Sequence, residues 1–138
     1  EITRIPVFGL AYKLSGHLLL DRGNKERAIA SMDTLVKVVR KHDLSIWLWP
    51  EGTRSRDGEL LPFKKGFVHL AIATGLPIVP IVTHHAARVW PVGTFRFSPG
   101  DVKVEVLGPI DTSNWSVDQL DSHVQEVRSL YCKALDVR

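Results

Sequence analysis

The sequence SIWLWPEGTRSR, residues 45–56, joins a short apolar run to a polar loop. Residues 45–49 are expected to form a buried strand, which Pro50 ends because proline cannot continue the hydrogen-bonded ladder. The loop after it, residues 51–58, contains two glycines, two hydroxyl side chains and two arginines. A strand end that leads into such a loop is a favoured ligand site in α/β sheets. This stretch therefore predicts an α/β fold with an anion-binding loop at the end of a strand.

Strands and helices are predicted to alternate through the first two thirds of the chain. The expected helices are residues 6–14, 23–41, 63–74 and 116–134, and the expected strands are residues 17–20, 45–49, 77–82 and 102–106, with another possible within 88–97. Gly75 is placed to end the third helix, and Ser116 has the form of a cap for the last one. This alternation predicts one layered α/β domain, with a mixed sheet flanked by helices.

Composition narrows the class of protein. The chain has 138 residues, of which 44% are hydrophobic and 24% charged, so one compact domain is expected and disorder is excluded. A net charge of +3 suits an anionic ligand or membrane surface but is too weak to indicate nucleic acid. A single cysteine, Cys132, excludes a disulfide framework and a cysteine-based metal site. The most apolar stretch, residues 67–82, is too short and too interrupted to span a membrane.

The loop after residue 50 offers chemistry for an oxyanion. Arg54 or Arg56 could grip a phosphate with two parallel hydrogen bonds. Thr53, Ser55 and the loop amides could bind the remaining oxygens. From residue types alone, a solvated charged turn remains the alternative.

Two further basic positions could share this anion. Arg22 follows the expected strand 17–20, so parallel strands would bring it near Arg54; a strand-end salt bridge is the alternative. Lys64 and Lys65 stand at the expected start of a helix, where free amides also favour an anion. The glycine spacing does not match the phosphate loop of nucleotide kinases, so phosphotransfer has no support.

The histidines and tryptophans are interpreted as structural residues. The predictions are loop positions for His84 and His85, solvent for His42 and His123, and a core position for His69. Trp47 and Trp49 are predicted to share one face of a strand and to pack in the core, with acyl-chain contact as the alternative. No metal site is predicted, because no histidine has suitable ligands near it.

Several motifs together resemble those of the glycerolipid acyltransferase family, typified by enzymes that act on 1-acylglycerol-3-phosphate. The matching segments are IPVFG at 5–9, GHLLLDR at 16–22, WPEGTRS at 49–55, FKKG at 63–66, LPIVPI at 76–81 and GPI at 108–110. They occur in the family's order and cover roughly residues 5 to 110, so the solvated-turn alternative is set aside.

The resemblance implies acyl transfer from an acyl thioester, either acyl-CoA or acyl-carrier protein, to the hydroxyl of a lysophospholipid. It implies no cofactor and no metal. The substrate-binding residues that it implies are Arg22, Glu51, Gly52, Thr53, Arg54, Ser55, Lys64 and Lys65. Arg22 and Arg54 would hold the acceptor phosphate, while Glu51 would orient Arg54 or the loop itself. It also implies association with the cytoplasmic face of a membrane, without a membrane-spanning segment in this chain.

One family motif is missing. The family's general base is a histidine separated by four residues from an aspartate, and no such pair occurs in residues 1–138. We therefore expect residues 1–138 to be an acyltransferase domain that lacks its N-terminal catalytic segment, with the pair upstream of Glu1. This chain alone is then expected to be inactive. A catalytically silent module that binds lysophospholipid and membrane is the alternative.

Overall fold

The computed structural model describes residues 25–137. The chain divides into two compact units, Glu1–Ser45 and Ile46–Arg138. The helix expected at residues 6–14, the strand expected at 17–20 and Arg22 lie outside the described residues.

The first unit contains helix α2 (Lys25–His42), which confirms the helix predicted from hydrophobic periodicity. Leu35 and Val39, one turn apart, are both buried, as expected for a one-sided apolar stripe. The last turn is basic, with Arg40, Lys41 and His42, and cations there complement the partial negative charge of a helix C-terminus.

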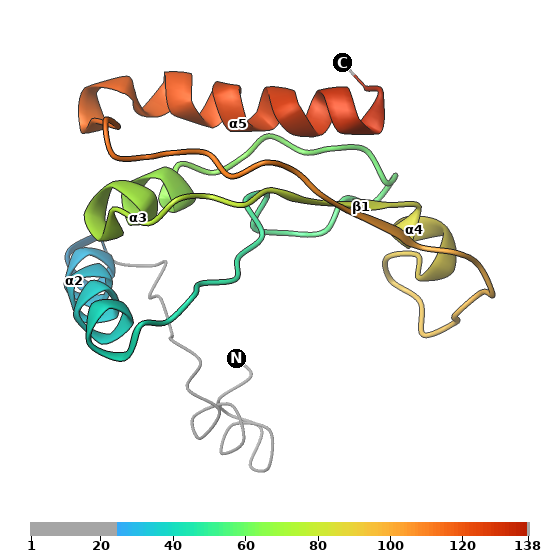
Figure 1. Ribbon diagram of the computed structural model, residues 1–138. Coiled ribbons are helices and arrows are strands. Elements are labelled where there is room, and N and C mark those ends of the chain that lie inside the picture. Colours follow the sequence, from blue (N-terminus) through green and yellow to red (C-terminus); the bar gives the residue numbers. More distant parts are fainter. Residues whose placement is uncertain (1–24, 138) are drawn as a thin grey trace, which may run out of the picture. The chain divides into compact units, whose positions relative to one another are not determined.

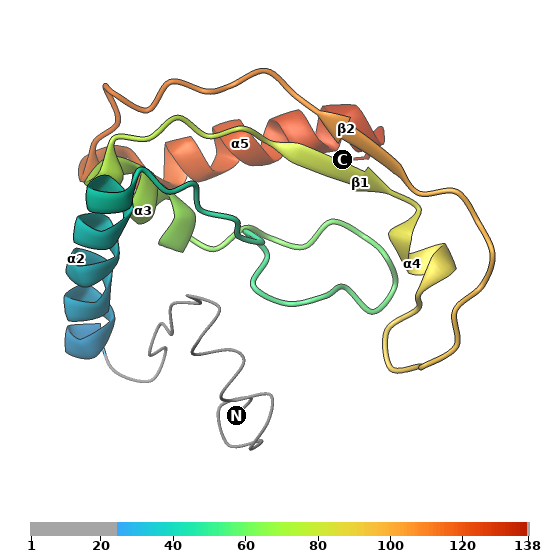
Figure 2. The ribbon, with the colours of Figure 1, turned by 60° about the horizontal axis from the view of Figure 1, so that its bottom comes forward.

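The second unit has a small sheet and four helical segments. Along the chain these are α3 (Gly66–Thr74), β1 (Ile81–His84), α4 (Ala86–Val89), β2 (Lys103–Val106), the 3-10 turn η2 (Val117–Gln119) and α5 (Leu120–Leu135). The two strands are antiparallel, with Ile81 opposite Val106 and His84 opposite Lys103. An antiparallel bridge between Ile78 and Ile110 lies outside the two strands. Helix α5 packs on α3 and β1 (Figures 1 and 2). The α/β class expected from the sequence is confirmed.

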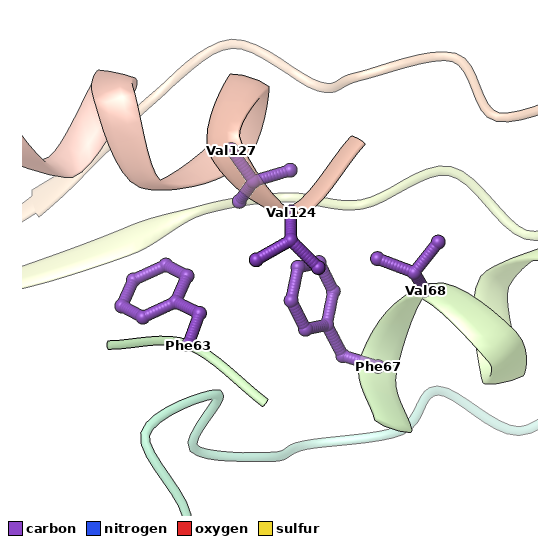
Figure 3. Close-up of a cluster of buried hydrophobic side chains, with 5 residues drawn as sticks. All are labelled: Phe63, Phe67, Val68, Val124 and Val127. Carbon is purple, nitrogen blue, oxygen red and sulfur yellow. The ribbon is translucent and has the colours of Figure 1, made fainter. Parts of the chain in front are cut away.

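The core of this unit lies between α5, α3 and the segment before α3. Figure 3 shows its five residues, Phe63, Phe67, Val68, Val124 and Val127. Val68 has no exposed surface and Val127 only 2%, and burying each valine stabilises the fold by roughly 1.5–3 kcal/mol. The Phe63 ring meets the Phe67 and Tyr131 rings edge to face, at centroid distances of 6.2 and 5.1 Å. The side of α5 that carries Val124 and Val127 therefore faces the core.

The strand predicted at residues 45–49 is wrong. This segment is irregular, and Trp47 and Trp49 are 65% and 72% exposed rather than packed in the core. They do lie on one side, with ring centroids 6.2 Å apart. In the part of the chain that the structure describes, the sheet has only β1 and β2, so this run has no strand beside it to complete a ladder.

The third expected helix and the strand after it are shifted along the chain. Helix α3 starts at Gly66 rather than at residue 63, and it ends as predicted at Gly75, whose φ is 69° and whose amide donates to the Ala71 carbonyl at 2.8 Å. The strand predicted at 77–82 is reduced to the bridge at Ile78 and to β1, which begins just after Pro80. Pro80 has no amide hydrogen to donate, which explains the break.

Three other expectations were wrong or incomplete. The possible strand within 88–97 is instead α4 and an irregular loop. Strand β2 is confirmed, but Val104 and Val106 on one of its faces are 58% and 64% exposed. Ser116 makes no side-chain capping bond, because the tighter turn η2 precedes α5.

Candidate functional site

The segment 49–58, which we name the Arg54 loop, starts with a tight turn. The Gly52 amide donates to the Trp49 carbonyl at 3.1 Å, and Gly52 has a φ of +71°, a conformation that glycine adopts without steric cost. The Lys64 amide then donates to the Pro50 carbonyl at 2.7 Å. These two bonds hold the base of the loop against the segment that leads into α3.

Glu51 fixes the loop from inside. Its half-buried carboxylate accepts a hydrogen bond from the Leu61 amide at 2.9 Å. Glu51 was expected to orient either Arg54 or the loop itself, and this contact is of the second kind.

The tip of the loop is closed by Asp57. The Ser55 hydroxyl donates to the Asp57 carboxylate at 2.5 Å, and the Glu59 amide donates to the same oxygen at 3.1 Å. The hydroxyl of Ser55 first, and the amide of Glu59 second, lower the pKa of the Asp57 carboxyl. The Ser55 hydroxyl therefore donates its hydrogen bond within the loop, and in this arrangement its oxygen can act toward a ligand only as an acceptor.

Arg54 rests on an aromatic ring. Its guanidinium carbon lies 5.0 Å from the centroid of the Trp90 ring, within the range of a cation–π contact. A guanidinium stacked on a ring keeps its N–H groups at the edge, where they can bind an oxyanion in pairs. Arg54 lines the cleft described next, whereas Arg56 is not part of its lining. The structure therefore places Arg54, and not Arg56, beside the cleft.

A cleft of about 810 Å³ lies beside the Arg54 loop, within the second unit. Such a volume is usual for ligand sites, which measure roughly 300–1,000 Å³. Its lining includes the buried apolar residues Phe63, Phe67 and Leu70, and the exposed cations Arg54 and Arg88. The carboxylate residues Glu51, Asp57 and Glu59 line it as well, so the cleft joins an apolar part to a polar part with charges of both signs. Trp47, Trp49 and Thr53 also line it.

The two lysines before α3 do not line this cleft. The ammonium group of Lys65 lies 2.7 and 2.8 Å from the two carboxylate oxygens of Asp121, which ties the start of α3 to α5. Both side chains are more than half exposed, so this ion pair contributes little to stability. Lys64 lies beside the turn instead, with its side chain close to Gly52.

His84 was predicted to lie in a loop, but it is the last residue of β1 and lines the cleft. Its Nε2 lies 3.2 Å from Glu105 Oε2, which also accepts from Lys103 Nζ at 3.0 Å. The hydrogen bond from Lys103 first, and that from His84 second, hold the pKa of Glu105 below its usual range. The pairing of the two strands explains this contact. His84 lies opposite Lys103, so Glu105, two residues further along the same strand, is its diagonal neighbour on the same face of the sheet.

The predictions for two other histidines were wrong. His123 is buried, and its ring stacks on Trp115 at a centroid distance of 4.3 Å, because it lies on the same stripe of α5 as Val124 and Val127. His69 is exposed, because the buried face of α3 is formed by the residues around it. Among residues 25–137, no group of three or more histidine, cysteine or acidic side chains could hold a metal ion.

None of the helices within residues 25–137 combines the length and the apolar character that crossing a membrane requires.

Known proteins that are similar to this chain share one description, acyltransferase. A family model described as Acyltransferase matches residues 1–84. The chain is 45% identical over 135 residues to a 1-acyl-sn-glycerol-3-phosphate acyltransferase of Limnanthes douglasii, covering 98% of this chain and 48% of that protein. It is 43% identical over 131 residues to a protein of the same name from Salmonella typhimurium, covering 95% and 51%.

A solved structure is also similar. It is the 1-acyl-sn-glycerophosphate (LPA) acyltransferase PlsC from Thermotoga maritima, with a TM-score of 0.74 and 27% identity, covering 99% of this chain and 54% of that one. The chain thus spans about half the length of the relatives it matches. The match to the family model and these similarities confirm the resemblance seen in the motifs, and the chain belongs to the acyltransferase family.

Proposed function

We propose that the protein containing this chain transfers a fatty-acyl group from an acyl thioester to the free hydroxyl of 1-acylglycerol-3-phosphate or a related lysophospholipid, giving phosphatidate. The observation that carries the proposal is the position of Arg54 on the rim of an apolar cleft. A lysophospholipid has the matching chemistry, an anionic phosphate joined to a hydrocarbon chain. The names of the relatives support the same acceptor.

The Arg54 loop would bind the acceptor phosphate. Arg54 offers two parallel hydrogen bonds, and the backbone around Gly52 and Thr53 offers further donors. Ser55 donates to Asp57, so it would bind a phosphate oxygen only after turning its hydroxyl hydrogen away from that carboxylate. Arg22, in the family's other phosphate motif, would add a second guanidinium.

The lysines would have different roles. Lys64, beside Gly52, would add positive charge to the loop. Lys65 would act on a donor or acceptor phosphate only after leaving Asp121.

The apolar part of the cleft would hold an acyl chain. Phe63, Phe67 and Leu70 supply its buried lining, and Trp47 and Trp49 supply exposed rings. Each methylene removed from water contributes about 0.8 kcal/mol, so even a few contacts discriminate between chain lengths.

The reaction itself needs a proton acceptor. As the acceptor oxygen attacks the thioester carbonyl, its proton must leave, the carbon–sulfur bond breaks, and the thiolate takes up a proton. We assign the base to a His-x4-Asp pair outside residues 1–138, since this stretch has none. The residues of this chain would position the hydroxyl, which lowers the barrier by several kcal/mol. The reaction would take place at the cytoplasmic face of a membrane, where the lipid substrates lie.

The test uses the intact natural protein with 1-acylglycerol-3-phosphate and, separately, acyl-CoA and acyl-carrier protein as donors. We expect release of one free thiol for each phosphatidate formed, measured by a thiol reagent and by mass spectrometry. Binding of lysophosphatidate without thiol release from either donor would instead support the silent binding module.

A further inference from the structure

The segment between α4 and β2 displays apolar side chains to solvent. Within residues 90–98, which we name the aromatic loop, Phe95 is 95% exposed, Phe97 66% and Trp90 44%. Figures 1 and 2 show this loop extending away from α5. A contiguous group of large exposed aromatic residues is unusual on a soluble surface and marks an interaction site.

The aromatic loop has a defined internal structure. Its ends are joined by a bond from the Ser98 amide to the Val89 carbonyl at 2.9 Å. The Trp90 indole donates to the Thr94 carbonyl at 2.9 Å, and the Trp90 and Phe97 ring centroids lie 4.9 Å apart. The exposure of Phe95 is therefore a property of a folded loop.

The positive charge of the chain around the aromatic loop is complementary to an anionic partner. Residues 86–100 contain Arg88 and Arg96 and no acidic residue. Aromatic rings settle at the level of lipid headgroups, and each nearby arginine is attracted to anionic lipid. Arginines interleaved with aromatic rings therefore complement an anionic bilayer surface.

We propose that the aromatic loop docks on an anionic lipid bilayer, with Phe95 and Phe97 entering the boundary between headgroups and acyl chains. Arg88 and Arg96 then face the headgroups. This inference rests on the proposed function at one point, the delivery of an acceptor lipid from that bilayer to Arg54.

Two contacts connect the Arg54 loop to the aromatic loop and to α4, which directly precedes that loop. Arg54 stacks on Trp90, and Gly58 packs so closely against α4 that a side chain at Gly58 would approach Ala87 at 3.3 Å. Docking would thus hold Arg54 near the plane of the headgroups. A lysophospholipid phosphate could then reach Arg54 while its acyl chain leaves the bilayer for the cleft.

The test attaches an environment-sensitive fluorophore to a Phe95→Cys variant of the intact protein, in a background with Cys132→Ser. The matched control carries the fluorophore at Val117→Cys, an apolar position on η2 that is 56% exposed. Vesicles of phosphatidylcholine and phosphatidylglycerol should shift the emission to the blue at position 95 and not at position 117. This local signal is informative even if other segments bind membranes.

The charged residues give a second measurement. Removing one charge with Arg96→Gln should raise the lipid concentration needed for half of the emission shift by about fivefold, since each such arginine contributes about 1 kcal/mol. Lys133→Gln, a charge-matched change on α5, should leave this concentration unaltered.

Three results would overturn the proposal. They are no shift at position 95, equal shifts at both positions, and a shift produced without vesicles by acyl-carrier protein or by raising the protein concentration. Turnover measured in detergent micelles reports on the proposed function separately. A silent probe with normal turnover rejects only the docking, and a responsive probe without turnover rejects only the acyl transfer.

Discussion

Replacing Arg54 by alanine should weaken use of the lipid acceptor far more than use of the thioester donor. Arg54 lines the cleft, and its guanidinium carbon lies 5.0 Å from the centroid of the Trp90 ring. No residue within 25–137 accepts a hydrogen bond from this guanidinium, so toward the described part of the chain its N–H groups are available to a phosphate. A hydrogen bond to a charged partner contributes about 1.5–3 kcal/mol. Losing this interaction therefore predicts a roughly 10- to 150-fold lower kcat/KM for the acceptor.

The effect on folding should be small. Arg54 is exposed, and a cation–π contact at an exposed site is worth about 0.5–1 kcal/mol. The midpoint of thermal unfolding should thus shift by only a few degrees. Circular dichroism on the same preparation separates loss of binding from loss of fold.

The assay varies the two substrates of the intact enzyme independently and follows thiol release. Arg54→Lys keeps the charge but loses the planar fork, and it should recover part of the activity. Arg56→Ala is the matched control, because Arg56 is exposed in the same loop but does not line the cleft. Acceptor binding by the unmodified enzyme should weaken with added salt, and this dependence should be smaller for Arg54→Ala. Equal losses for donor and acceptor, or an equal loss in Arg56→Ala, would refute the reasoning.

Three other changes test the fold. Gly75→Ala should cost about 1 kcal/mol in urea unfolding, because the left-handed φ of 69° strains any side chain, whereas Gly66→Ala should be nearly neutral. His123→Phe should raise the unfolding free energy by about 1 kcal/mol at pH 7, because neither buried ring nitrogen has a hydrogen-bond partner among the described residues. The nearest carboxylate oxygen, Glu126 Oε2, lies 3.6 Å from Nδ1, beyond hydrogen-bond distance, so a lower unfolding free energy would show that this ion pair stabilises the fold. Burial raises the pKa of Tyr131, so the unfolded chain loses that proton first and stability falls once the pH exceeds about 10. Between pH 8 and 10.5, Tyr131→Phe should lose less unfolding free energy than the unmodified protein, as measured by urea unfolding. An equal loss in both proteins would show that Tyr131 does not cause the pH dependence.

Local patterns in the sequence predicted several elements well. The helix expected at residues 23–41 is α2 (Lys25–His42), and the helix expected at residues 116–134 is largely α5 (Leu120–Leu135). Gly75 ended α3 as expected. Each of these features depends on residues within one or two turns, so nearby sequence is enough to determine it.

Parts of the site could not be predicted in this way. The contact of Arg54 with Trp90 and the pairing of Lys65 with Asp121, 56 positions later, join segments that only folding brings together. Trp47 and Trp49 alternate as strand residues do, but a strand also needs a hydrogen-bonded neighbour. Apolar character alone could not distinguish the core from the lining of a cleft.

The sequence by itself determined the family, the glycine, hydroxyl and arginine residues that make up the loop around Arg54, and the helices that frame the core. These follow from residue types at fixed spacing, which a linear chain displays directly. Only the tertiary structure decided that Arg54 rather than Arg56 lines the cleft, that Glu51 holds the loop, and that the aromatic loop lies beside it. The physical reason is that hydrogen bonds, ring stacking and burial depend on distances between side chains, and these distances exist only once the chain has folded.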